Sequence, residues 1–246
     1  MPGTGDSDRP SRTWQHVGAD PRLGRLPVLM LALTVVSGVV DAASILGLGH
    51  VFVANMTGNI VFLGLGVVGA PGFDIVRNLI VLAAFAAGAV LGGYLAQRVG
   101  RHKPSVARDA AAVTALGLLV CLVLLLTLDL AGEGELRVVS AIAAASLGVQ
   151  FAGARTVAVP DMTTSVVTGT LSGLAAEHVH AAPGAASRRA LVLVALLLGA
   201  AVGGLLMLAV GGVRGTAAAV GLAVVLLAGV SVTAGIDVRR ERASAA

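Results

Sequence analysis

Charged residues are scarce in this chain of 246 residues, where Asp, Glu, Lys and Arg together make up 12%. Soluble domains carry about 25% charged residues, and this chain is 57% hydrophobic, which excludes a soluble globular protein. Alternation of β-branched and polar residues is also rare, which disfavours a membrane β-barrel. Aromatic residues, at 3%, leave only a thin belt at the membrane surface. We therefore expect an all-α, polytopic membrane helix bundle in a lipid bilayer.

Cysteine and catalytic motifs are lacking too. The one cysteine, Cys121, lies in an apolar run, so an internal disulfide and a cysteine-based metal site are excluded. The chain has no Walker loop, no H-E-x-x-H and no G-x-S-x-G, and we expect no enzyme. His178 and His180 would point apart on a helix and have no further ligands beside them, so we predict no metal and no cofactor.

Basic residues lie mostly at the ends of apolar runs, where they act as topology signals. We therefore do not take the net charge of +4 as a sign of nucleic-acid binding. Two segments, 51–70 and 157–177, are apolar but interrupted by polar residues. Six other runs are long enough to cross about 30 Å of hydrocarbon at about 1.5 Å per residue. They are roughly residues 27–48, 77–98, 109–130, 136–154, 190–210 and 215–236.

The two interrupted segments decide the topology. With a cytoplasmic N-terminus and neither segment crossing, 14 of the 17 basic residues face the cytoplasm, and only Arg77, Arg137 and Arg214 face outwards. If both segments cross, the division becomes 11 against 6. The positive-inside rule favours the first arrangement. We expect about six full crossings plus two interrupted or half-length helices, with both termini cytoplasmic, and eight crossings is the alternative.

The halves of the chain align in four places and in the same order. "SGVVDAAS" from Ser37 aligns with "SLGVQFAG" from Ser146, Met56-Thr57 with Met162-Thr163, "GAVLGGYL" from Gly88 with "GAAVGGLL" from Gly199, and Gly117 with Gly221. This order indicates a duplication. Because each half crosses three times, the two repeats are inverted, and such repeats with interrupted helices are typical of transporters and channels.

We divide the chain accordingly. Residues 1–26 are polar and are expected to be a disordered cytoplasmic tail. Residues 27–131 form the first membrane repeat and residues 136–237 the second, and residues 238–246 form a basic cytoplasmic tail.

The segment "VFVANMTGNIVFLGLG", residues 51–66, holds Asn55, Thr57, Gly58 and Asn59 in an apolar setting. Irregular backbone at membrane depth must be covered by protein or line a water-filled cavity. Asn55 or Thr57 could cap a short helix beginning near Gly58, and the free N–H groups of such a helix start suit an anionic group or a polar solute. The alternative is that these side chains only cap and join helices.

The second segment, "VPDMTTSVVTGTLSG", offers Asp161, Thr163, Thr164 and Ser165 in the same role. Asp41 lies within the first apolar run, where a charge near the bilayer centre costs about 2.5–3.5 kcal/mol. Such residues face a bundle interior and mark an ion or proton path. Its partner in the aligned repeat is Gln150, and we expect both side chains to face the centre, with a structural hydrogen bond as the alternative for Asp41.

The stretch "SGVVDAASILGLGHVFVANMTGNIVFLGLG" resembles the opening signature of the YoaK-type family of bacterial inner-membrane proteins, a domain of unknown function. The matching residues are Asp41, Asn55, Met56, Thr57, Gly58 and Asn59. The second copy reads Met162-Thr163-Thr164 where the family often has Gly after Thr. The resemblance spans roughly residues 27–240 and implies a small polytopic inner-membrane protein, a presumed permease, without implying a substrate.

We therefore expect a transporter or channel for an unidentified small polar or anionic solute, with its path where the repeats meet. The alternative is a non-transporting membrane scaffold or sensor partner. The expected partners are the lipid bilayer and the solute, and assembly into a homo-oligomer stays open.

Overall fold

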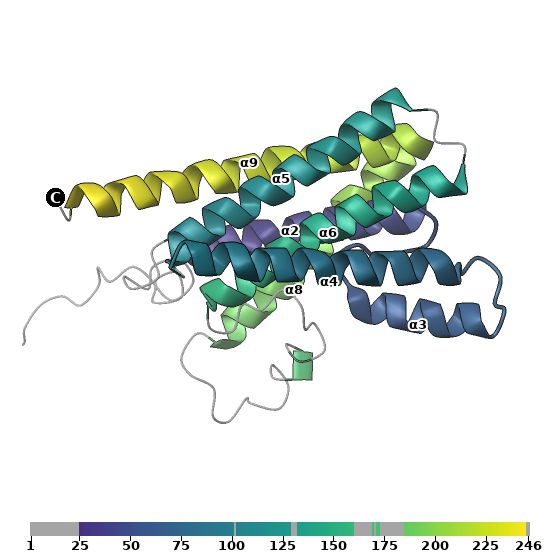
Figure 1. The fold of residues 1–246 in the computed structure, drawn as a ribbon, viewed down its shortest axis with the longest axis horizontal. Coiled ribbons are helices and arrows are strands. Elements are labelled where there is room, and N and C mark those ends of the chain that lie inside the picture. The colour runs from purple at the N-terminus through teal and green to yellow at the C-terminus, as the bar shows by residue number, and fades with distance from the viewer. Residues whose placement is uncertain are drawn as a thin grey trace, which may run out of the picture.

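The structure is a computed structural model that describes residues 25–100, 102–128, 132–159, 169, 171–172 and 185–244. Within these residues every regular element is a helix (Figure 1). Six helices are long and apolar enough to cross a membrane. They are α2 (Leu26–Gly47), α4 (Ile75–Arg98), α5 (Lys103–Thr127), α6 (Glu133–Val157), α8 (Ala185–Val210) and α9 (Gly212–Ser244). The prediction of an all-α polytopic bundle is confirmed, and the described residues hold the six spans that were expected.

Helix α3 (Met56–Val67) has 12 residues. At about 1.5 Å per residue it is about 18 Å long, which is too short to cross about 30 Å of hydrocarbon. It occupies the first of the two interrupted segments. Of the second segment, 157–177, the structure describes residues 157–159, 169 and 171–172.

Two helices differ from their expected bounds. Helix α5 begins at Lys103 rather than near residue 109, with Pro104 in its first turn, where the missing N–H of proline carries no penalty. Helix α9 continues to Ser244, so residues 238–244, expected to form a basic tail, extend the last helix. The tail expected over residues 1–26 lies outside the described residues up to residue 24.

Contacts between helix ends define the two ends of the bundle. Nη1 of Arg77, near the start of α4, donates to the carbonyl of Gly49, just after α2, at 3.0 Å. Nη2 of Arg77 pairs with Glu133 at the start of α6. We call this end, where α2 ends and α4 and α6 begin, the hairpin end. Because α2 ends and α4 begins there, the chain between them enters and leaves the bundle on one side.

The opposite end holds the last turns of α9 beside the start of α5. Nε2 of His102, the residue before α5, lies 2.8 Å from Oε2 of Glu241. A cavity of about 660 Å³ opens here, lined by Arg98, Val99, His102, Ser105, Arg108, Val238 and Glu241. It lies at the opposite end of the bundle from Gly49, Arg77 and Glu133.

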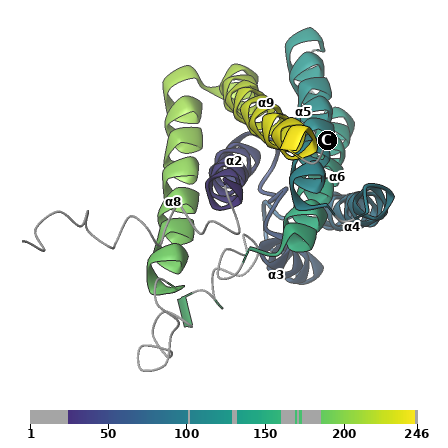
Figure 2. The same ribbon diagram turned by 90° about the vertical axis from the view of Figure 1, so that its left-hand side faces the viewer.

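Glycines bring the helices of two pairs into close contact. Helix α4 packs on α6 and α2 packs on α8, on opposite flanks of the bundle (Figure 2). A Cβ on Gly88 or Gly92 of α4 would overlap the backbone of α6, and a Cβ on Gly199 or Gly203 of α8 would overlap the backbone of α2. Small residues let helix backbones approach within a membrane, where packing rather than the hydrophobic effect joins helices.

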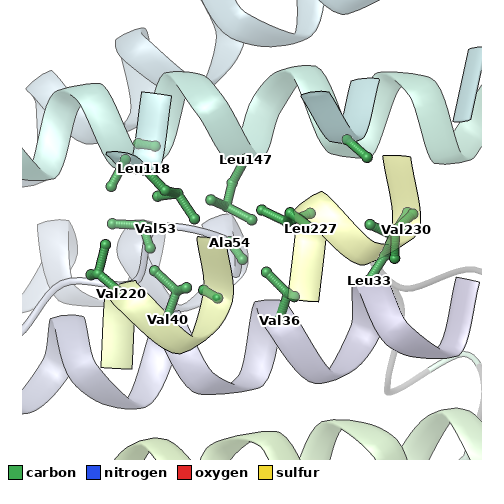
Figure 3. Packing of buried hydrophobic residues seen from close by; sticks show 14 of the residues in the cluster. Leu33, Val36, Val40, Val53, Ala54, Leu118, Leu147, Val220, Leu227 and Val230 are labelled. Carbon is green, nitrogen blue, oxygen red and sulfur yellow. The ribbon is translucent and has the colours of Figure 1, made fainter. Parts of the chain in front are cut away.

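Helices α5 and α9 connect the two pairs. They pack on each other, α5 also packs on α6, and α9 also packs on α2. One core of buried apolar side chains runs through the bundle. It includes Val51, Val53 and Ala54 from the segment that precedes α3. Figure 3 shows Val53 and Ala54 among side chains of the long helices, including Val40, Leu118, Leu147 and Val220. Since Leu147 lies near the middle of α6, this segment reaches deep into the bundle.

Candidate functional site

The candidate site is the re-entrant hairpin, which we define as residues 48–67. After α2 the chain turns at Gly49 and His50, both with positive φ (86° and 56°), a region that glycine adopts freely and other residues adopt rarely. Residues 51–55 then run back along α2, and α3 begins at Met56. Helix α3 packs on α4 and returns the chain to the hairpin end.

The carboxylate of Asp41 binds the backbone of this hairpin just before α3. Oδ1 of Asp41 accepts hydrogen bonds from the backbone N–H groups of Val53 (2.9 Å) and Ala54 (2.8 Å). Asp41 is 8% exposed and lies roughly 9 Å along the α2 axis from Gly47. The Ser44 hydroxyl, one turn further on, donates to the carbonyl of Val51 at 2.8 Å. The backbone of the returning segment thus finds its partners on α2, as backbone polar groups away from water must.

Asp41 and Ser44 belong to a polar stripe on α2 that also includes Thr34 and Ser37. Their spacing of three, four and three residues places them on one helix face, and all four are buried. The sequence reasoning singled out Asp41 alone. Thr34, Ser37 and Ser44 recur at helical spacing, and this spacing could have revealed the stripe.

Asn59, on α3, binds the backbone of residues 51–55, the segment that runs back along α2. Its Oδ1 accepts from the N–H of Phe52 at 2.8 Å, and its Nδ2 donates to the carbonyl of the same residue at 2.6 Å. Asn59 is fully buried. Its amide therefore replaces the two hydrogen bonds that a neighbouring strand would give to Phe52, and it does not point into open space.

Gly58 makes room for the ring of Phe52, because a Cβ on Gly58 would overlap that ring. The Phe52 ring stacks on Phe62 with centroids 5.4 Å apart, and Phe62 packs on Phe73 at 5.0 Å. This row of aromatic rings joins the returning segment, α3 and the turn before α4. Gly58 thus leaves space for the ring of Phe52, and Asn59 binds its backbone, so both residues place Phe52.

Asn55 and Thr57 differ from their neighbours because both side chains are exposed. Asn55 is the N-cap of α3 but makes no side-chain capping bond. The prediction that Asn55 or Thr57 caps a helix beginning near Gly58 is wrong in two respects. The helix begins at Met56, and the Asn55 side chain makes no capping bond. The Asp41 carboxylate binds the N–H groups of Val53 and Ala54, which precede the helix and are not the N–H groups that a cap binds.

Gln150 extends from α6 to α2. Its Nε2 lies 3.2 Å from the carbonyl of Leu33 and 3.3 Å from Oγ of Ser37. Its Oε1 is buried and has no hydrogen-bond partner among the described residues. Gln150 is 1% exposed, so this oxygen is an acceptor held in the interior of the bundle.

An ionic network at the hairpin end was missed by the sequence reasoning. Arg77 is 4% exposed and binds both the carbonyl of Gly49 and the carboxylate of Glu133. Nη2 of Arg137 on α6 lies 2.7 Å from Oδ2 of Asp74, which also caps α4 through the N–H groups of Val76 and Arg77. Two ion pairs thus join the starts of α4 and α6. In one the arginine belongs to α4, and in the other it belongs to α6.

The remaining predicted residues of the path, Asp161, Thr163, Thr164 and Ser165, lie outside the described residues, as do His178 and His180. Among the residues that are described, no group of three or more His, Cys, Asp or Glu side chains could hold a metal ion. The described part of the predicted site is therefore Asn55, Thr57, Gly58 and Asn59 in the hairpin, with Asp41 on α2 and Gln150 on α6.

The fold and this hairpin define a polytopic helical membrane protein with a re-entrant segment. The family model described as "Protein of unknown function (DUF1275)" matches residues 29–232, and the chain belongs to this family. The predicted resemblance to the YoaK-type family is confirmed.

A curated relative is the UPF0700 transmembrane protein YoaK of Bacillus subtilis (strain 168). It is 32% identical over 150 residues, which cover 59% of this chain and 64% of the relative, slightly less than two thirds of its length. No solved structure matches the chain.

Proposed function

We propose that this protein is a small transporter or channel whose path for a small polar solute runs past the re-entrant hairpin, between the two halves of the chain. The observation that carries the proposal is the contrast within the hairpin. Val51, Val53 and Ala54 are packed into the core, yet the polar side chains of Asn55 and Thr57 directly after them are exposed. Exposed polar groups on a segment at membrane depth are expected where the segment lines a water-filled path.

Matching glycine contacts in the two halves favour an inverted duplication, which is typical of transporters. Gly38 of α2 lies against Leu196 and Gly199 of α8, and Gly148 of α6 lies against Phe85 and Gly88 of α4 in the matching way. Gly203 against Val39 and Gly92 against Val149 repeat the correspondence. When the two halves are aligned by these contacts, Gly38 corresponds to Gly148. Asp41 then corresponds to Phe151 rather than to Gln150. Thus the hairpin carboxylate has an apolar counterpart, and we propose that the two halves play unequal roles.

The path lies between two helix pairs that can move as units. Close glycine contacts hold α2 to α8 and α4 to α6. Between the pairs, the hydrogen bonds from Gln150 to Leu33 and Ser37 are long, at 3.2 and 3.3 Å, and bonds of this length are weak. Separation at this contact would open the bundle beside Asp41.

The cellular placement is part of the proposal. The end of the bundle opposite the hairpin carries Arg98, Lys103, Arg108, Arg155, Arg239 and Arg240. The positive-inside rule assigns that end to the cytoplasm. We propose a multi-pass protein of the bacterial inner (cytoplasmic) membrane with both termini inside.

A non-transporting scaffold or sensor partner is the second candidate, and one observation favours it. The polar groups of Asp41 and Asn59 are engaged by the backbone of the hairpin itself. These two residues therefore have a structural role that needs no solute.

Thiol labelling separates the two candidates. In a Cys121→Ala background, Thr57→Cys is treated with a membrane-impermeant, charged thiol reagent from each side of the membrane. A path predicts reaction from both sides, whereas a scaffold predicts reaction from neither side or from the hairpin side alone. Val90→Cys, near the middle of α4 and 75% exposed, is the control, and we expect it to stay unlabelled from both sides.

A further inference from the structure

We infer that the solute of this path is a small neutral or cationic hydrogen-bond donor, of the amide or amine class, and is not an anion; the inference rests on the proposed function. The sequence pattern alone left an anionic solute open, because the start of an α-helix attracts anions. The arrangement of charges around the hairpin changes that expectation.

The protein's own carboxylate lies close to the start of α3. Asp41 accepts from the N–H groups of Val53 and Ala54 at 2.9 and 2.8 Å, immediately before α3. An anion arriving at the same helix start would meet Asp41 at close range. Like charges repel strongly where the local dielectric constant is low.

The charges along the described path offer nothing to balance an anion. Among the buried residues that the structure describes, the charged ones are Asp41 and Arg77. Arg77 lies at the hairpin end and is already bound to Gly49 and Glu133. The described interior therefore favours a positive or neutral solute.

In the middle of the bundle, the free hydrogen-bonding capacity of the described side chains is acceptor capacity, whereas Nε of Arg77 at the hairpin end is a buried donor without a partner. Nε2 of Gln150 is engaged by Leu33 and Ser37, whereas its Oε1 has no partner in the described part of the chain. The Ser37 hydroxyl donates to the carbonyl of Leu33 at 3.1 Å, so its oxygen can only accept. A buried acceptor without a partner is unfavourable, and a passing N–H or O–H donor would satisfy it.

Three planar molecules of similar size test the inference: guanidinium, urea and nitrate carry a charge of +1, 0 and −1. Swelling of proteoliposomes that contain the full chain is measured for each by light scattering, against protein-free liposomes. Guanidinium is supplied with the permeant anion thiocyanate, and nitrate with K⁺ and valinomycin, so that counter-ion flow does not limit swelling. We expect protein-dependent entry of guanidinium or urea and none of nitrate. Gln150→Leu should slow that entry roughly tenfold, as expected for one lost hydrogen bond. Gln150→Glu, which keeps an acceptor, should retain entry of guanidinium.

The outcomes separate the inference from the proposed function. Entry of nitrate without guanidinium or urea would overturn the inference and leave the transporter standing. Unchanged guanidinium and urea entry in Gln150→Leu would overturn the role of the Gln150 acceptor. Entry of none of the three, with protein that unfolds cooperatively on heating, would count against the proposed function and the inference together. Gln97→Leu, an exposed position on α4, is the control for the loss of an amide.

Discussion

Asp41 and Ala54 are joined by a 2.8 Å hydrogen bond between a carboxylate on a membrane-spanning helix and a backbone N–H thirteen residues further along the chain. The same oxygen binds Val53. These N–H groups lie in the apolar core, so they depend on Asp41 for a partner. Asp41 therefore supports the hairpin whether or not it also meets a solute.

Loss of the Asp41 oxygen should destabilise the whole protein. Asp41→Ala leaves the N–H groups of Val53 and Ala54 without an acceptor, at about 1–3 kcal/mol for each unsatisfied group. We expect the unfolding temperature to fall by roughly 5 °C or more. Cys121 is the one cysteine and is buried, so a thiol-reactive fluorophore reports unfolding without any engineered label.

Asp41→Asn is the matched variant for this measurement, because the amide keeps an oxygen that can accept both bonds. It should unfold at a temperature between those of Asp41→Ala and the wild type. Equal unfolding temperatures for Asp41→Ala and the wild type would mean that the hairpin does not depend on this residue.

The fit between Gly58 and Phe52 gives a second prediction. Gly58→Val places side-chain atoms where the Phe52 ring lies, and overpacking of this kind costs about 1–3 kcal/mol. A second substitution, Phe52→Ala, should recover part of the lost stability by emptying that space. Gly64→Val on the same helix, where a Cβ meets nothing within 4 Å, controls for valine in α3. Equal losses at positions 58 and 64 would contradict the fit.

Adjacent glycines on α4 and α8 give a third prediction. A Cβ on Gly92 would lie 2.7 Å from the carbonyl oxygen of Val149, and a Cβ on Gly203 would overlap Val39, whereas Gly93 and Gly204 have nothing within 4 Å. Gly92→Val and Gly203→Val should lower the yield of folded protein sharply and to a similar extent. Gly93→Val and Gly204→Val should be tolerated, as judged by size-exclusion chromatography after detergent extraction. A tolerated Gly92→Val would count against the close approach of α4 and α6.

The sequence was sufficient for the six spans because their length and apolar content are set by the bilayer. It was also sufficient to mark residues 51–66 as interrupted, since side-chain amides without partners are costly in lipid. It was not sufficient for the roles within that stretch. Asn59 and Gly58 serve Phe52, whose residue type carries no polar signal. The partners of Asp41 are backbone groups, and periodicity of side chains does not reveal them.

The ionic network shows the same limit at longer range. From the sequence, Arg77 and Arg137 are topology signals only. Arg77 binds Glu133 from 56 residues away and Arg137 binds Asp74 from 63 residues away. Their pairing depends on how α4 packs against α6, which glycine contacts along both helices determine. No local pattern fixes such a partner.

Asp74 gives the last prediction, on acid stability. Burial by itself raises the pKa of Asp74, but hydrogen bonds from Arg137, Arg77 and Val76 outweigh it, so the pKa lies below its ordinary value. A carboxyl with a lowered pKa in the folded protein stabilises it above the ordinary pKa of about 3.9, and this contribution is lost as the pH falls through the folded value.

Asp74→Asn keeps a side chain that can cap α4 but cannot titrate. Melting followed by circular dichroism in detergent should therefore find the wild type more stable than the variant at pH 7. The difference should shrink as the pH falls below about 4. In an Arg137→Gln background the difference at pH 7 should be smaller from the start, and a difference that stays constant from pH 7 to pH 3 would show that the Asp74–Arg137 pair does not contribute to stability.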